Sequence, residues 1–260
     1  MTHINSISCG QGAPSLYLLL MAHQGIFPAD VVIVADTGGE NDMLWSTGER
    51  TTAREFFERV TKPLAEEFGF DVAFVRANDG NGQPLPDIMS VQRIAEDGKF
   101  EIDLPLFGSR GGRLQQSCTS KWKKAAVRQE LRRRGATTVT TNLGLTMDEV
   151  HRMKNNDVKW ERLHWPMLLN QKTYRVECEE KLAAAGIPWI VRSQCDFCPH
   201  KNPFRWGMSS PATLNAAAEF EASFNGEFFL SSKRIPLKMV LDAPTTGDLF
   251  DGCDQGYCFV

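Results

Sequence analysis

A pair of cysteines near the C-terminal end of the sequence carries the strongest chemical signal. Cys195 and Cys198 are separated by two residues and are followed by Pro199. A Cys-x-x-Cys turn brings two thiolates to one side, where they can bind one metal ion or two corners of an iron–sulfur cluster. A closed site needs two more ligands. Cys118 is one candidate, because it opens an expected helix whose dipole would lower the pKa of its thiol. Cys178 is the other, so the predicted metal ligands are Cys118, Cys178, Cys195 and Cys198.

These residues leave the kind of metal open. We favour an iron–sulfur cluster of the [4Fe–4S] type. Zinc is the alternative, with His200 or Cys178 as a further ligand. A metal-free redox dithiol fits less well, because Cys195 does not open a helix after a first strand, as the cysteines of thioredoxin motifs do. Cys9 is expected to be a small packed residue.

A glycine-containing loop follows the first expected strand and leads into an apolar helix. Its chemically suggestive residues are Ser8, Gly10, Gly12 and Ser15. Glycines let a phosphate approach the backbone amides closely, and the dipole of the following helix attracts an anion. The loop matches neither the Walker pattern nor the dinucleotide fingerprint, so by itself it could be a tight connection only. We expect these four residues to contact the phosphates of a nucleotide.

The second expected strand ends in Asp36, Thr37 and Gly38. Open α/β sheets bind ligands at the carboxyl ends of their strands, where a carboxylate can hold a ribose or an adenine amine. Asp36 could instead cap the next helix. We favour the nucleotide role and predict that Asp36 and Thr37 bind the cofactor.

Lysines and arginines are concentrated in residues 110–134, although the whole chain has a net charge of −3. The net charge argues against a general coating of nucleic acid, whereas the local concentration suggests a polyanionic substrate such as a nucleotide, a sulfated nucleotide or a nucleic acid. A solvated helix face is the competing interpretation, above all for residues 132–134. The cations that we expect to bind phosphate or sulfate are Arg110, Arg113, Lys123, Arg128 and Arg152.

Four motifs taken together resemble the phosphoadenylylsulfate (PAPS) reductase and PP-loop ATP pyrophosphatase superfamily, and most nearly the reductase-like proteins of phages and mobile elements. The motifs are Ser8-x-Gly10-x-Gly12-x-x-Ser15, Asp36-Thr37-Gly38, Cys118-Thr119-x-x-x-Lys123 and Cys195-x-x-Cys198-Pro199. The resemblance implies a five-stranded sheet like that of the adenine nucleotide α-hydrolases. It also implies that the first motif holds phosphates and that the second lies near the nucleoside.

The sequence departs from that family at three places. Pro14 stands where ATP-cleaving members carry an aspartate, which removes a carboxylate from Mg-ATP cleavage. Reductases carry a catalytic cysteine on a mobile C-terminal segment, and Cys253 and Cys258 match it by location only. Residue 117 is a serine where cluster-bearing reductases have a second adjacent cysteine. Either Cys178 completes the ligand set, or three cysteines leave one iron open to bind the sulfur of a substrate, as in some sulfur-handling members.

An α/β framework must position these residues. Strands are expected at 4–8, 31–35, 71–76 and 137–141, and helices at 15–23, 47–68 and 121–134. This alternation predicts parallel βαβ units and a doubly wound, mostly parallel sheet. Further helices are expected near 147–153, 172–185 and 211–224. We place a boundary near residue 142, between a nucleotide-binding core (1–142) and a helical or irregular C-terminal subdomain (143–260) with the cysteine site. The second part could also pack back on the sheet as one domain.

Composition sets the broad class of the protein. A chain of 260 residues with 42% apolar residues can form an ordinary core. Its apolar runs are too short to span a bilayer, and its first residues do not have the pattern of a secretory signal. We therefore expect a cytoplasmic protein with reduced cysteines and no membrane partner. A homodimer is compatible with the sequence but is not specified by it.

The function that we expect is adenine-nucleotide-dependent sulfur transfer to a nucleic acid or nucleotide, with a cysteine-bound iron–sulfur cluster. Lys123, Asp36 and Cys118 are the expected catalytic residues. The nucleotide would be ATP, with Mg²⁺ as an optional companion. One alternative is a reductase that uses PAPS or its unphosphorylated relative APS and releases sulfite. The other is a non-catalytic protein that binds a nucleic acid or a protein partner and contains structural zinc.

Overall fold

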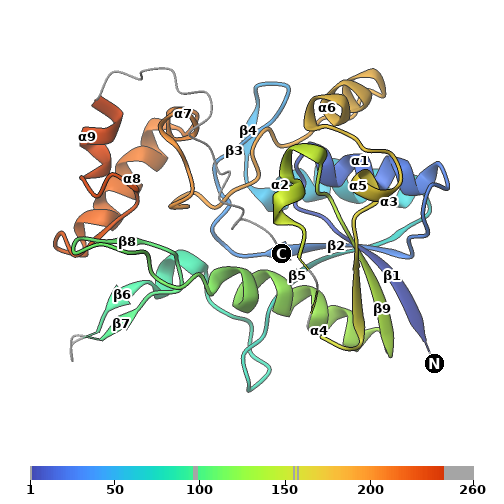
Figure 1. The fold of residues 1–260 in the computed structure, drawn as a ribbon, viewed down its shortest axis with the longest axis horizontal. Helices are drawn as coiled ribbons and strands as arrows, with labels where there is room; N and C mark the ends of the chain where they lie inside the picture. The colour runs from blue at the N-terminus through green and yellow to red at the C-terminus, as the bar shows by residue number, and fades with distance from the viewer. Residues whose placement is uncertain (1, 96–98, 155, 157, 243–260) are drawn as a thin grey trace.

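A five-stranded parallel sheet forms the centre of the computed structural model, which describes residues 2–95, 99–154, 156 and 158–242 (Figure 1). The strands lie in the order β10-β9-β1-β2-β5, and every neighbouring pair is parallel. In chain order this is the 3-2-1-4-5 arrangement of doubly wound α/β proteins, so the predicted fold class is confirmed. The strand bounds are β1 His3–Ser8, β2 Val31–Asp36, β5 Asp71–Arg76, β9 Thr138–Leu143 and β10 Glu161–His164.

Helices cover both faces of this sheet because β2 is apolar on both sides. Val32 and Val34 pack with the helices of one face, whereas Val31 and Ile33 pack with Val127 of α4 on the other. The helices of the first face are α1 Ala13–His23, α2 Ala53–Phe56, the π-helical turn Phe57–Thr61, α3 Lys62–Glu67 and α6 Arg175–Ala184. The opposite face carries α4 Ala125–Arg133, which continues a π-helical turn at Thr119–Lys124. The sheet with these helices is called the sheet lobe below.

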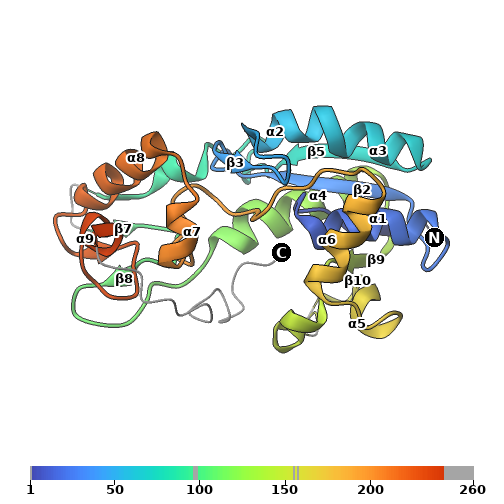
Figure 2. The same ribbon diagram turned by 90° about the horizontal axis from the view of Figure 1, so that it is seen from above.

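A second lobe is built from residues 85–95, 99–118 and 197–242, and lies to the left in Figures 1 and 2. Its own core includes Leu104, Trp206, Phe224 and Leu230, together with Trp122 from the π-helical turn before α4. Its elements are η2 Ile88–Val91, β6 Arg93–Ile94, β7 Phe100–Glu101, β8 Phe107–Gly108, α7 Pro203–Gly207, α8 Pro211–Ala222, β11 Phe228–Phe229 and α9 Leu237–Asp242.

The chain passes between these lobes more than once. The expected boundary at residue 142 falls inside β9, and β10, which follows it, pairs with β9 in the sheet. The 3₁₀ segment η4 Met147–Arg152 and α5 Pro166–Leu169 also lie in this later part of the chain. Residues on both sides of residue 142 therefore contribute to both lobes. The structure contains no helix within the described residues that is long and apolar enough to cross a membrane.

Most expected elements are found, with two differences. The helix expected over 47–68 begins only at Ala53, and a small hairpin, β3 Met43–Leu44 with β4 Arg50–Thr51, precedes it. Gly48 has φ of +89° in that turn, and Thr52 with Glu55 forms a capping box that starts the helix. The second difference is β10, a strand that the sequence analysis did not expect. It has only four residues, three of which are polar, so no alternating apolar pattern marks it.

Candidate functional site

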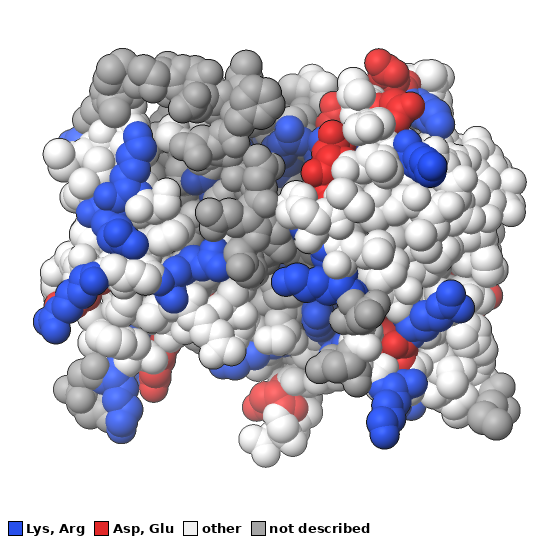
Figure 3. Space-filling view, viewed as in Figure 1, with Lys and Arg blue, Asp and Glu red and all other residues white. Residues whose placement is uncertain are grey.

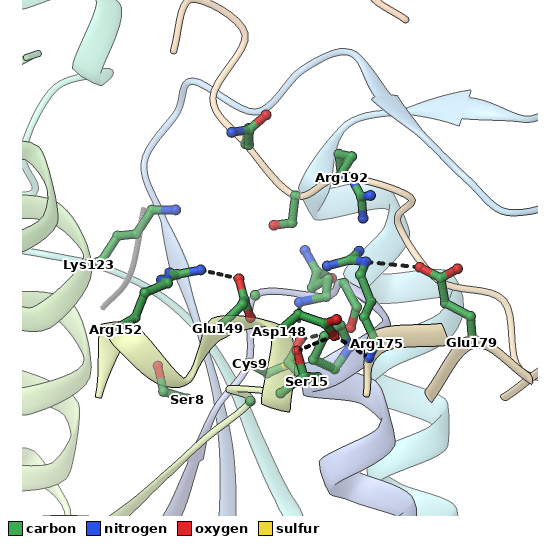
Figure 4. Close-up of a pocket in the computed structure, with 18 of the residues that line it drawn as sticks. Ser8, Cys9, Ser15, Lys123, Asp148, Glu149, Arg152, Arg175, Glu179 and Arg192 are labelled. Carbon is green, nitrogen blue, oxygen red and sulfur yellow. Dashed lines mark hydrogen bonds and ion pairs between the residues drawn. The ribbon is translucent and has the colours of Figure 1, made fainter. Parts of the chain in front are cut away.

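A cavity of about 550 Å³ lies at the carboxyl ends of β1, β2 and β9, where a doubly wound sheet is expected to bind ligands. All four predicted loop residues, Ser8, Gly10, Gly12 and Ser15, line it. Other parts of the wall come from residues between 144 and 152, from the start of α6, from residues 192–194, and from Glu40, Lys123 and Arg205. Figure 4 shows charged side chains from these separate elements around one space. The glycine loop is therefore placed where an anion could reach it.

The shape of the glycine loop depends on residues that its sequence pattern did not single out. Gln11 has a left-handed φ of 61°, and its side chain is held by bonds to the Ala53 carbonyl and the Thr61 hydroxyl, both of 3.0 Å. Gly144 lies directly against the start of α1. A Cβ atom there would lie 3.0 Å from the Ser15 amide nitrogen. The loop is thus fixed from both sides, with the N-terminus of α1 directed at the cavity.

Among the described residues, five Lys and Arg side chains line the large cavity, and the sequence analysis identified two of them. Lys123 and Arg152 were expected. Arg175, Arg192 and Arg205 were not. Arg175 could have been recognised from the sequence. It lies in the first turn of a helix, where a positive charge is unfavourable because of the helix dipole, and such a position suggests a role in ligand binding. Figure 3 shows Lys and Arg side chains spread over this face of the molecule, several of them near its middle.

Carboxylates balance some of these cations. Lys123 is 3.1 Å from Glu40, Arg175 is 3.0 Å from Glu179, and Arg152 is paired with Glu149. In the described part of the chain no carboxylate lies within ion-pair distance of Arg192 or Arg205. Burial, together with the charges of Arg175 and Arg205, lowers the pKa of Arg192 to about 10. An excess of positive charge therefore remains on this wall, and it favours an anionic ligand.

A second, smaller cavity of about 40 Å³ adjoins the first and is lined by Cys118, Cys195 and Cys198. Lys123, Ser193 and Gln194 line both cavities. The Cys-x-x-Cys turn is closed by a 3.2 Å bond from the Cys198 amide to the Cys195 carbonyl. Three of the four cysteines predicted as ligands are thus brought to one place.

The turn is anchored to the loop after β2 by a residue that the sequence analysis overlooked. The Asp196 carboxylate accepts bonds from the amides of Asn41 (2.9 Å) and Asp42 (3.2 Å). The Asp196 amide in turn donates to the Gly39 carbonyl over 2.7 Å. This docking brings the Cys195 sulfur to 3.7 Å from the Thr37 hydroxyl. Thr37, predicted to bind the nucleotide, therefore lines the cysteine cavity instead.

Cys178 does not join the other three. It is fully buried on α6 in the core of the sheet lobe, with its sulfur 3.5 Å from that of Met167. Burial raises its pKa to about 12, as expected of a packed thiol. The expectation that Cys178 completes the ligand set is therefore not supported by its position. Cys9 is also buried in that core, which agrees with the packing role expected of it.

The expected acidification of Cys118 is corrected by the structure. Cys118 does precede a helical segment, the π-helical turn Thr119–Lys124. Burial nevertheless raises the pKa of the Cys118 thiol, and the nearby charge of Lys123 offsets this only in part. Burial also raises the pKa of Cys195, to about 12, and the charge of Glu40 adds to the rise. At Cys118, burial therefore outweighs the lowering effect of the Lys123 charge on the pKa.

The remaining predicted residues lie outside the lining of the large cavity. Asp36 is 2.8 Å from Arg76 and accepts a bond from the Gly38 amide, which holds the loop after β2. Arg128 is 2.7 Å from Glu161. Arg110 is exposed in the turn after β8, and Arg113 follows it without lining either cavity. The reductase-like counterparts, Cys253 and Cys258, lie outside the described residues.

Comparisons with known proteins give little further information. No family model matches the chain, and no curated protein matches it. Among solved structures, the U34-tRNA thiolase NcsA from Methanococcus maripaludis, determined with its [4Fe-4S] cluster, is similar to this chain at 13% sequence identity and a TM-score of 0.42. The alignment covers 86% of this chain and 74% of that one. A likeness at this level does not identify a function, which has to be argued from the site itself.

Proposed function

We propose that this protein is an enzyme that binds an adenine nucleotide in the large cavity and transfers sulfur at an iron–sulfur cluster held in the small one. The observation that carries the proposal is the shared wall. Lys123, Ser193 and Gln194 line both cavities, so a group on the nucleotide can meet a group at the cysteines without leaving the protein. A nucleotide site directly beside three thiols is the arrangement that sulfur activation requires.

The nucleotide half of the proposal rests on the glycine loop and the cations that face it. The loop offers backbone amides at the start of α1, and Arg192 and Arg205 supply charge without carboxylate partners among the described residues. Arg175 fixes this wall, because its guanidinium donates to the Val191 carbonyl over 2.9 Å. Mg²⁺ would arrive with the phosphates of ATP, which it binds through oxygen ligands.

The metal half of the proposal rests on three thiols in one cavity. Within the described residues no three Cys, His, Asp or Glu side chains come close enough together to hold one metal ion. Sulfurs around a single zinc lie about 3.8 Å apart, since each Zn–S bond of the tetrahedron is about 2.3 Å. A cluster binds each thiolate at a different iron, so its ligands lie further apart. Cys118, Cys195 and Cys198, which line one cavity, are the residues that would hold the cluster.

Such a cluster would supply one chemical property when bound: an iron without a protein thiolate can bind sulfur. The chain's own residues would position the reactants. Lys123 stands between the cavities and can hold a negatively charged group as it passes from one to the other. Glu40 orients Lys123 through the 3.1 Å ion pair, and its carboxylate is 3.9 Å from the Cys195 sulfur. The Thr37 hydroxyl also contacts that sulfur, at 3.7 Å.

The first test is iron and acid-labile sulfide analysis of protein purified without oxygen. We expect roughly four irons and four sulfides per chain, with a brown chromophore. Cys118→Ser, Cys195→Ser and Cys198→Ser should each lose most of the iron. Cys178→Ser is the matched control and should keep it, because Cys178 lies in the other core. One zinc per chain without sulfide would refute the proposal and favour a structural zinc protein that binds a partner.

A sulfonucleotide reductase is the second candidate, and Pro14 favours it. This residue lines the large cavity where ATP-cleaving relatives of the suggested family have a carboxylate, so the cavity lacks that Mg²⁺ ligand. Product analysis separates the two functions. AMP and pyrophosphate formed from ATP would support sulfur transfer, whereas sulfite released from PAPS or APS in the presence of a thiol reductant would support the reductase.

A further inference from the structure

Two arginines of the large cavity lack the carboxylate partners that balance their neighbours. Arg192 and Arg205 both line the cavity, and no carboxylate of the described residues lies within ion-pair distance of either. Their charges are close enough that Arg205 helps to lower the pKa of Arg192. The N-terminus of α1, Lys123 and Arg152 already serve the glycine-loop side of the cavity. Among the described residues the cavity lining has five Lys and Arg side chains against four carboxylates, so the Arg192–Arg205 pair gives it a net positive charge.

Exposed aromatic side chains accompany these cations. Tyr174 lines the cavity and is 49% exposed, and it directly precedes Arg175. Phe204 is 67% exposed and directly precedes Arg205 on α7. Figure 2 shows α7 on the side of the second lobe that is turned toward the sheet lobe. A phenylalanine so exposed contributes little to the core, although Trp206, two residues later, is almost completely buried.

From this combination we infer that the rim of the large cavity binds a single-stranded segment of nucleic acid. Tyr174 and Phe204 stack on unpaired bases, and Arg192 and Arg205 contact the phosphates that join them. The inference rests on the proposed function, since it names the acceptor class for the transferred sulfur. A base held on Tyr174 lies at the mouth of the cavity that leads past Lys123 to the cysteines.

A single strand fits this rim better than a duplex. Aromatic stacking requires an open base face, which a duplex offers only at its ends. A duplex surface also needs a broad basic footprint, whereas this chain has a net charge of −3 and its cavity-lining arginines are gathered in one place. Free nucleotides with a second phosphate would use the arginines but would not need Phe204, which does not line the cavity.

Fluorescence anisotropy with a short labelled oligonucleotide of mixed sequence, as RNA and as DNA, tests the inference on the full chain. We expect binding that weakens steeply with added salt and that the corresponding duplex does not compete away efficiently. Phe204→Ala should weaken binding about tenfold, in line with the loss of one stacked base. Arg192→Ala with Arg205→Ala should weaken it further and reduce the salt dependence. Phe100→Ala (exposed aromatic, second lobe) and Arg162→Ala (exposed cation, β10) are the matched controls and should bind as the wild type.

The outcomes separate this inference from the proposed function. ATP binding is measured in parallel by competition with a fluorescent adenine nucleotide, and iron is measured as above. Loss of oligonucleotide binding in Phe204→Ala, with ATP binding and iron retained, supports the inference. Equal binding of the oligonucleotide by wild type and Phe204→Ala, or equal competition by the duplex, overturns it and leaves the proposed function standing. Wild-type protein that binds the oligonucleotide but holds no iron overturns the proposed function and leaves the nucleic-acid site.

Discussion

The two cavities share a wall but are built differently. The difference predicts whether a substitution in each cavity affects ligand binding or folding. The large cavity is lined by loops at the ends of a rigid sheet, and its charged groups are partly open to water. The small cavity is lined by cysteines that pack into the core of the second lobe with Trp122, Trp206 and Phe224. Changes at the first should mainly affect ligand binding. Changes at the second should affect the folding of a whole lobe.

Metal removal should give the largest effect, a loss of stability that is confined to the second lobe. Ligand binding free energy is also folding free energy, so a lobe whose core contains the ligands loses stability with its metal. Treating the anaerobic protein with a chelator and an oxidant is expected to raise amide hydrogen exchange at least tenfold in residues 197–242, while β1, β2 and α1 stay protected. Exchange that changes equally in both lobes would contradict the comparison.

Glu221 offers a metal-independent way to weaken the second lobe. It is almost completely buried, and its carboxylate accepts bonds from the amides of Leu230 (2.7 Å) and Leu237 (2.6 Å). Glu221→Ala leaves two buried donors without acceptors, which costs about 2–6 kcal/mol in urea unfolding at about 1–3 kcal/mol per group. Glu221→Gln is the matched control. It keeps the size of the side chain and one acceptor, and should cost less.

Glu221 also gives the second lobe a defined pH dependence. Burial raises the pKa of this carboxyl above its ordinary value of 4.5, and the two amide bonds counteract the rise only in part. Between the unfolded and the folded pKa the folded state binds more protons, so stability falls as pH rises through that window. Glu221→Gln should remove this slope in unfolding measured across mildly acidic pH. A slope that persists unchanged would assign it to another group.

Gly144 tests whether the geometry of the glycine loop, and not its charge, sets nucleotide affinity. A Cβ atom at residue 144 would lie 3.0 Å from the Ser15 amide nitrogen and 3.1 Å from the Pro14 carbonyl carbon. Neither backbone atom can move without shifting the start of α1, so Gly144→Ala should cost about 1–3 kcal/mol of stability and weaken ATP binding. In the control variant Gly80→Ala, the added methyl meets nothing within 4 Å, and residue 80 does not line the cavity. Calorimetry with ATP should separate the two.

The sequence predicted the features that depend on neighbouring residues and missed those that depend on tertiary packing. β5 was found with its observed bounds, and the glycine loop was located, because both are determined by neighbouring residues. The grouping of Cys118 with the Cys195 turn was also predicted, from its place at the start of an expected helix and from the family resemblance. The partner of that turn on the sheet lobe, Asp196, could not be recognised, because an acidic residue between two cysteines has no local pattern. Cys178 was misassigned for a related reason: burial within a helix is decided by what packs on it.

Arg192 should show the smallest effect on stability and a clear effect on binding. It is partly buried beside Arg175 and Arg205, so removing its charge relieves repulsion and ends the cost of burying it. Arg192→Gln is therefore expected to leave the free energy of unfolding unchanged or to raise it by up to about 1 kcal/mol. The same variant should bind the oligonucleotide about tenfold more weakly, since a phosphate contact to a charged donor is lost. Thermal unfolding and anisotropy on one preparation measure both. A variant that loses stability and binding together would mean that Arg192 holds the wall in place, and the separation between a binding cavity and a folding cavity would then be less sharp than the structure implies.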